Sequence, residues 1–228
     1  MKPGIARSIF AGLAGLATMI TIVAIAVLVF LNPVYIGFGQ GRAGAAELTG
    51  YDDATVTRVT NAILHDLLVG PPNFGVQVNG ETVLGERERA HMADVRNVFA
   101  AFGALAILAV LIFVNEAIVW RREAWFRRAI RRGAVILAML VVVLGLFATV
   151  AFDSVFETFH ELLFPPGSFD FDPNSKLIQL FPDQFWFETS LLLAVVILVL
   201  CALTAVLVRG GRADPEPDPA PVDQGSPA

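Results

Sequence analysis

The sequence predicts a mainly α-helical membrane protein with four transmembrane helices, both termini in the cytoplasm and a small α+β extracytoplasmic cap. Three observations lead to this fold class. Of the 228 residues, 56% are hydrophobic, and the mean hydropathy of +0.67 is unusually high for a soluble domain of this size. Four long apolar runs account for that hydropathy, and arginines gather beside alternate ends of these runs.

Each apolar run is long enough to form a transmembrane helix. The four runs comprise residues 8–31, 97–120, 134–152 and 189–208. About 19 to 24 helical residues, rising 1.5 Å each, cross a hydrocarbon core of about 30 Å. Only the second run contains a formal charge, Glu116, which we expect to reach Arg121 or Arg122 at the membrane surface.

The arginines orient these helices in the membrane. Six of them lie in the short segment 121–133, and further basic residues flank the first and last runs. Because short cytoplasmic loops are rich in Lys and Arg, we place segment 121–133 and both termini in the cytoplasm. The Pro-rich tail, residues 209–228, is expected to be disordered.

The two remaining segments, 32–96 and 153–188, then lie outside the cell. In the first, an amphipathic helix begins at Asp52 or Asp53, and Asn79-Gly80 marks a β-hairpin. Its last residues are expected to extend the second transmembrane helix outward. The second segment begins with a helical pattern that either continues the third transmembrane helix or lies in the membrane interface, and it is rich in phenylalanine.

Two histidines stand out, because His91 and His160 both lie beside an outer membrane boundary. Antiparallel helices could bring them together among carboxylates, and imidazole is well suited to accepting and returning protons near neutral pH. This arrangement suggests proton-transfer chemistry on a membrane substrate. Candidate orienting carboxylates are Glu88, Asp94, Asp153 and Glu157, and candidate walls of an acyl-chain groove are Phe156, Phe159, Phe164 and Phe169.

Two other functions are compatible with these residues. Glu88-x-x-His91 and Glu157-x-x-His160 resemble the ligand pairs of di-iron carboxylate bundles, which would make the protein a metal-dependent membrane enzyme. Such a site needs further carboxylates; Glu188 could supply one, but the first helix offers none, so we expect no metal and no cofactor. Alternatively, the protein is a non-catalytic assembly or sensor protein whose solvated histidines respond to external pH.

Other classes find no support in the sequence. The single cysteine, Cys201, excludes an internal disulfide and a cysteine-based metal cluster. There is no Gly-rich phosphate loop, and we expect no nucleic-acid partner.

The histidine segments resemble the bacterial lipoprotein intramolecular transacylase family, Lit. The resemblance lies in E-x-x-H-M-x-D-V, starting at Glu88, and in F-D-x-x-F-x-x-F-H-x-x-x-F, starting at Phe152. A later pattern, D-P followed by L-I-x-L-F-P-x-x-F, starts at Asp172. Together with the helix and loop lengths, the similarity extends over about residues 8–208.

The resemblance implies an enzyme of the bacterial cytoplasmic membrane, with its active site on the extracytoplasmic side. Its substrates would be diacylglyceryl-modified lipoproteins, in contact with membrane lipids. It would move the sn-2 acyl chain to the amine of the N-terminal cysteine and leave a lyso-form lipoprotein. In this scheme we expect His160 to act as general base and His91 as acid or oxyanion stabiliser, although the roles could be reversed.

Overall fold

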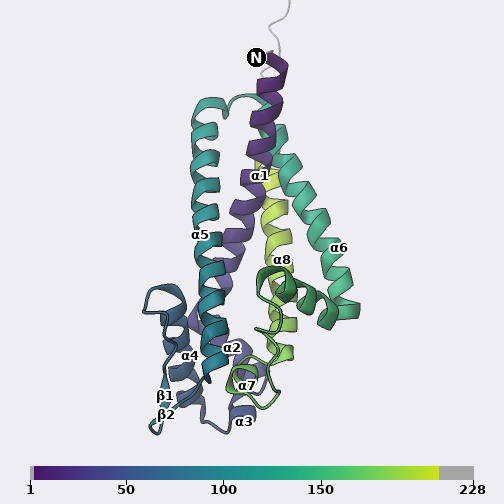
Figure 1. The fold of residues 1–228 in the computed structure, drawn as a ribbon. Coiled ribbons are helices and arrows are strands. Elements are labelled where there is room, and N and C mark those ends of the chain that lie inside the picture. The colour runs from purple at the N-terminus through teal and green to yellow at the C-terminus, as the bar shows by residue number, and fades with distance from the viewer. Residues whose placement is uncertain (1–2, 211–228) are drawn as a thin grey trace, which may run out of the picture.

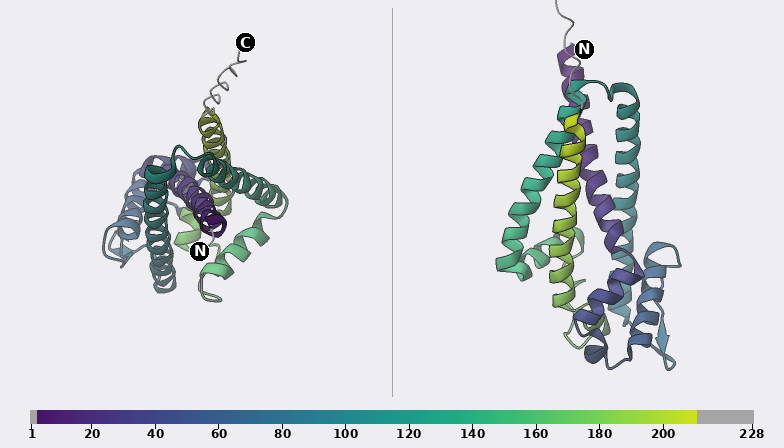
Figure 2. Two further views of the ribbon diagram at one scale, coloured as in Figure 1. Left: turned by 90° about the horizontal axis from the view of Figure 1, so that it is seen from above. Right: turned by 180° about the vertical axis from the view of Figure 1, so that it is seen from behind.

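The computed structural model describes residues 3–210 and confirms the expectation of a mainly helical chain with four candidate membrane spans. The long helices are α1 (Pro3–Phe30), α5 (Glu86–Trp120), α6 (Ala124–Leu163) and α8 (Asp183–Leu207). The start of α1, the α5–α6 connection and the end of α8 lie together at one end of the bundle, here called the arginine-rich end (Figures 1 and 2). The predicted disordered tail lies largely outside the described residues.

The helices are longer than the apolar runs. Helix α5 begins at Glu86, so the charged residues before the second run do extend it, as expected. Helix α6 begins at Ala124, so most of the predicted loop 121–133 is helical. The reason is visible in the burial pattern, because Phe126, Ala129 and Ile130 occupy one helical face and pack inside the bundle.

The sharpest local feature is a kink in α6. Ala151 has φ −141° and ψ 50°, which are not helical angles. Beyond it the helix turns back toward α8 instead of continuing along the bundle axis (Figure 1). The ring of Phe152 lies 5.3 Å from that of Phe187, and the ring of Phe156 lies 6.1 Å from that of Trp186. These aromatic contacts hold the turned part of α6 against α8.

Small residues allow α1 and α6 to approach closely. A Cβ atom added at Gly133 would lie 2.4 Å from the carbonyl oxygen of Gly15, which leaves no room for any side chain. Next to this contact, Ala134 of α6 belongs to a cluster that includes Ala26 of α1, and both alanines are fully buried. Close packing of small residues is a common source of helix association in membranes, where the hydrophobic effect does not drive it.

The prediction for Glu116 was wrong. Its side chain is only 2% exposed, and its carboxylate oxygens have no hydrogen-bond partner among the described residues. The physical reason is helical geometry: residues five or six positions apart do not share a face, so Arg121 and Arg122 point elsewhere. Glu116 therefore faces the bundle interior.

The cap lies at the opposite end of the bundle and contains short helices and one hairpin. Its elements are α2 (Pro33–Arg42), α3 (Ala45–Thr49), α4 (Asp53–Leu68), β1 (Gln77–Val78), β2 (Glu81–Thr82) and α7 (Lys176–Leu180). Asp52 caps α4 by accepting a hydrogen bond from the Thr55 amide at 2.8 Å, as predicted. The predicted hairpin is also confirmed, with Asn79 and Gly80 both at positive φ in the turn.

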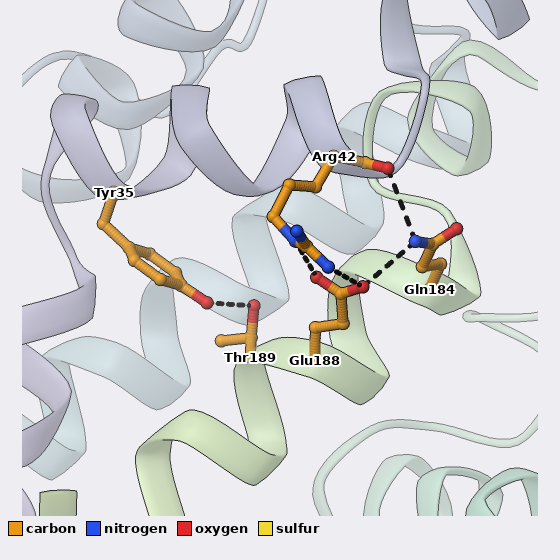
Figure 3. A network of polar contacts seen from close by, with 5 residues as sticks. All are labelled: Tyr35, Arg42, Gln184, Glu188 and Thr189. Atoms are coloured by element: carbon orange, nitrogen blue, oxygen red, sulfur yellow. Dashed lines mark hydrogen bonds and ion pairs between the residues drawn. The ribbon is translucent and has the colours of Figure 1, made fainter.

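The cap has its own core and is tied to the bundle. Apolar residues of α4, the hairpin and α7, with Phe74 and Leu180 fully buried, pack around Met92 of α5. Figure 3 shows the polar contacts between α2 and α8, in which Arg42 binds Glu188 through two nitrogen–oxygen contacts of 2.7 and 3.1 Å. Glu188, which the di-iron hypothesis considered as a further ligand, is therefore paired with Arg42. A terminal 3₁₀ turn, Val208–Gly210, ends the described chain.

Candidate active site

The two histidines meet at the cap end of the bundle. His91 lies in the second turn of α5, and His160 lies near the end of α6, beyond the kink at Ala151. Their ring centroids are 6.3 Å apart, with an angle of 25° between the ring planes. The convergence expected from the sequence is therefore found, and it depends on the kink, because a straight α6 would carry His160 away from α5.

His91 is buried among aromatic rings. It is 6% exposed, and its ring lies 4.8 Å from that of Phe164 and 5.4 Å from that of Phe171. Its Nδ1 atom has no hydrogen-bond partner among the described residues. A buried polar atom without a partner is unusual in a folded protein.

The surroundings keep His91 neutral at physiological pH. His91 lies before the membrane-crossing part of α5, since residues 97–120 are enough to span the membrane. Burial, the largest cause, and the charge of His160 together lower the pKa of His91 to about 4, although Asp94 acts in the opposite direction. A neutral imidazole donates one hydrogen bond and accepts one, so His91 can polarise an oxygen without carrying a positive charge.

His160 has a defined orientation and tautomer. Its Nδ1 lies 2.7 Å from the carbonyl oxygen of Phe156, one turn earlier in α6. Because a carbonyl oxygen can only accept, Nδ1 carries the proton, which leaves Nε2 as the acceptor in the neutral ring. A histidine held in this way is ready to take a proton at Nε2.

All four phenylalanines expected to line a groove surround His160. Their ring centroids lie 4.1 to 5.6 Å from that of His160, for Phe156, Phe169, Phe159 and Phe164. Phe164 also contacts His91, so it bridges the two histidines. The rings give the pair an apolar surround that suits an acyl ester.

The four candidate carboxylates occupy different places. Both oxygens of buried Glu88 accept backbone N–H groups, from Gly85 at 2.6 Å and from Leu177 at 2.7 Å. Glu88 thus joins the start of α5 to α7. Asp94 acts electrostatically on His91, while Asp153 and Glu157 are exposed on the turned part of α6.

The metal hypothesis gains no support from the arrangement of donors. No three His, Cys, Asp or Glu side chains among the described residues are grouped so that they could hold a metal ion. The third histidine, His65, pairs with Asp66 at 3.3 Å on the exposed side of α4.

Sequence reasoning missed Arg87 and Phe171. Arg87 donates hydrogen bonds to the carbonyl oxygens of Gly167 and Asp170, at 3.0 and 3.1 Å, and its guanidinium lies 5.8 Å from the ring of Phe171. It therefore fastens the loop after α6 beside His91. One signal was available, because Arg87 lies four residues before His91 and shares its helical face.

Comparison with known proteins identifies a family to which the sequence is similar. A family model described as "Lipoprotein intramolecular transacylase Lit" matches residues 11–186. An uncharacterised protein from Aquifex aeolicus is 27% identical over 117 residues, which are 51% of this chain and 52% of that protein. The chain thus matches about half the length of this curated relative.

Solved structures share the fold. The in meso structure of the membrane integral lipoprotein intramolecular transacylase Lit from Bacillus cereus has a TM-score of 0.78 at 20% identity, covering 90% of this chain and 95% of that one. A variant of that protein with a histidine replaced by alanine has a TM-score of 0.73 at 18% identity, covering 90% and 93%. The family match and the shared architecture agree: the chain belongs to the lipoprotein intramolecular transacylase family, Lit.

Proposed function

We propose that this protein is a membrane acyltransferase that moves the sn-2 acyl chain of a diacylglyceryl lipoprotein to the amine of its N-terminal cysteine. The product is a lyso-form lipoprotein. Family membership supports the reaction class. The observation that carries the proposal is the pair of imidazoles 6.3 Å apart in a phenylalanine-lined site.

The reaction requires little beyond positioning and proton transfer. The donor ester and the acceptor amine belong to one substrate, so their proximity is largely provided by the substrate itself. The amine nitrogen forms a bond to the acyl carbon, and the bond from that carbon to the glyceryl oxygen breaks. One proton passes from the amine to the departing oxygen. No acyl-enzyme intermediate is needed.

His160 is the proposed general base. Its Nδ1–H donates to the Phe156 carbonyl, so Nε2 is the atom that accepts the amine proton in this proposal. The resulting imidazolium then protonates the glyceryl oxygen as it leaves. A base positioned in this way contributes roughly 10²–10⁴-fold to the rate.

His91 is the proposed oxyanion stabiliser. With its pKa lowered to about 4, it is neutral during the reaction and donates a hydrogen bond to the oxygen of the tetrahedral intermediate. Of the two roles considered for His91, acid or oxyanion stabiliser, the lowered pKa favours the second. The low polarity around Phe164 and Phe171 strengthens that hydrogen bond.

We further propose that the site faces the extracytoplasmic side of the bacterial cytoplasmic membrane. The arginine-rich end holds the six arginines of residues 121–133, which the positive-inside rule assigns to the cytoplasm. Four spans then put both termini inside and the cap, with the histidines, outside. The substrates, lipidated in the membrane, would reach the site from the outer leaflet.

Mass spectrometry of a tracer lipoprotein tests the proposal. The purified chain is incubated with a diacylglyceryl lipoprotein in lipid vesicles, and the N-terminal peptide is analysed for an N-acyl lyso-form. Because the transfer is intramolecular, the total mass does not change, and an N-acyl-cysteine fragment in the tandem mass spectrum marks the product. His160→Ala and His91→Ala are expected to abolish this fragment, whereas His65→Ala, at an exposed position of α4, should retain it. An N-terminal peptide that keeps both O-acyl chains with the folded wild-type protein would refute the activity.

A further inference from the structure

A groove separates parts of α1 and α6 near the arginine-rich end, far from the histidines. Its volume is about 600 Å³. Glycines line it where the two helices come together, and Gly12 and Gly15 belong to α1. Because glycine has no side chain, these positions leave open a space that larger residues would fill. The reaction proposed above makes no use of this groove.

The groove is cationic at one end. Arg7 of α1 and Arg128 and Arg132 of α6 line it, and no acidic residue of the described part of the chain does. Arg128 and Arg132 are one helical turn apart, so they project from the same face. The guanidinium of Arg7 lies 5.9 Å from the ring of Trp125, another lining residue. Within residues 3–210, the ion pairs are Arg42–Glu188 and His65–Asp66, so none of these three arginines is neutralised by a carboxylate.

The other end of the groove is apolar. Both helices run from the arginine-rich end into the apolar part of the bundle, and the deeper lining residues are Leu16, Met19 and Ile136. A free inorganic anion would pair with the arginines but would leave this surface uncovered. A neutral lipid would cover it but would leave three cations without a counterion. An amphiphile with an anionic head satisfies both ends.

We propose that this groove binds an anionic phospholipid of the adjacent leaflet. Its phosphate lies between Arg7, Arg128 and Arg132, where guanidinium groups pair well with phosphate oxygens. An acyl chain follows Leu16 and Met19 toward the membrane centre. The bound lipid fills the gap between α1 and α6 and thereby strengthens a helix contact that otherwise depends on Gly15 and Gly133.

Native mass spectrometry of the full chain in detergent tests the charged end. Phosphatidylglycerol and phosphatidylcholine are titrated against the wild type and two matched double variants. Arg128→Gln with Arg132→Gln should weaken phosphatidylglycerol binding roughly thirty-fold, at about fivefold for each arginine. The control, Arg121→Gln with Arg122→Gln, removes equal charge from residues that do not line the groove. Equal weakening in both variants, or equal binding of the two lipids by the wild type, would overturn the proposal.

A second pair of variants tests the apolar end without changing charge. A Cβ atom at Gly12 meets nothing within 4 Å, so Gly12→Leu can fold while filling the groove. It should weaken phosphatidylglycerol binding, whereas Gly145→Leu, at another position with open space, should not. Inorganic phosphate is added as a competitor. Full displacement of the lipid by phosphate at matched concentration, or unchanged binding in Gly12→Leu, would show that the apolar surface plays no part and would overturn the assignment.

Discussion

Replacing Glu88 by alanine should destabilise the cap and disable the site through the fold alone. The carboxylate is 7% exposed, and its two oxygens accept the amides of Gly85 and Leu177 at 2.6 and 2.7 Å. Hydrogen bonds to a charged group contribute about 1.5–3 kcal/mol each, so losing both costs about 3 kcal/mol or more. The buried Leu177 amide is then left without a partner, and α7 loses its link to the start of α5.

Thermal unfolding of the purified protein measures this loss. For a chain of this length, about 3 kcal/mol corresponds to a fall in Tm of roughly 6 °C or more. Glu86→Ala is the matched control, because Glu86 lies in the same first turn but is exposed. If Glu88→Ala unfolds at the same temperature as Glu86→Ala, the two hydrogen bonds do not hold α7 in place. Conversely, lost activity with unchanged Tm would assign Glu88 to the chemistry.

Three further outcomes are expected. The pKa of His91 is lowered to about 4 in the folded chain, from about 6.5 in the unfolded chain, so the unfolded state binds more protons between these values. As the pH falls from 7 to 4.5, the Tm of the wild type should therefore fall more than the Tm of His91→Phe. Parallel curves of Tm against pH for the two proteins would contradict this. Gly133→Ala should lower Tm sharply, because the new Cβ would lie 2.4 Å from the carbonyl oxygen of Gly15 in α1. The control Gly145→Ala places its Cβ in open space and should be neutral or stabilising by up to about 1 kcal/mol. Similar Tm values for the two variants would disprove the close contact. Arg87→Ala should slow acyl transfer without lowering Tm, because it releases the loop after α6. The control Arg58→Ala loses an exposed hydrogen bond to the Gln77 carbonyl on the hairpin and should retain the wild-type rate. Equal rates of acyl transfer in the two variants would show that Arg87 does not support the site.

The elements that the sequence predicted well are those encoded by neighbouring residues. Apolar runs of sufficient length specify membrane helices because every backbone polar group must be satisfied within the segment. Asp52 caps α4 through an amide three residues away, and Asn79-Gly80 closes the hairpin between adjacent strands. In each case the interacting groups lie within one or two turns of each other, so the local pattern is enough.

The site was predictable only in part. His91 and His160 stood out because titratable rings beside membrane segments are uncommon, and their roles were suggested by the family resemblance. The role of Glu88 was not predictable, since one of its partners, Leu177, is 89 positions away. Arg87 was missed for the same reason, because its partners lie in the loop after α6.

The sequence by itself determined the number of membrane helices, the turn chemistry of the cap and the residues capable of proton transfer. The tertiary structure decided that α6 bends at Ala151, where no proline or glycine marks a break, and it thereby decided that the two imidazoles meet. The physical reason is that the bend depends on aromatic contacts with α8, including Phe152 with Phe187. Such contacts join distant parts of the chain and leave no periodic pattern in the sequence.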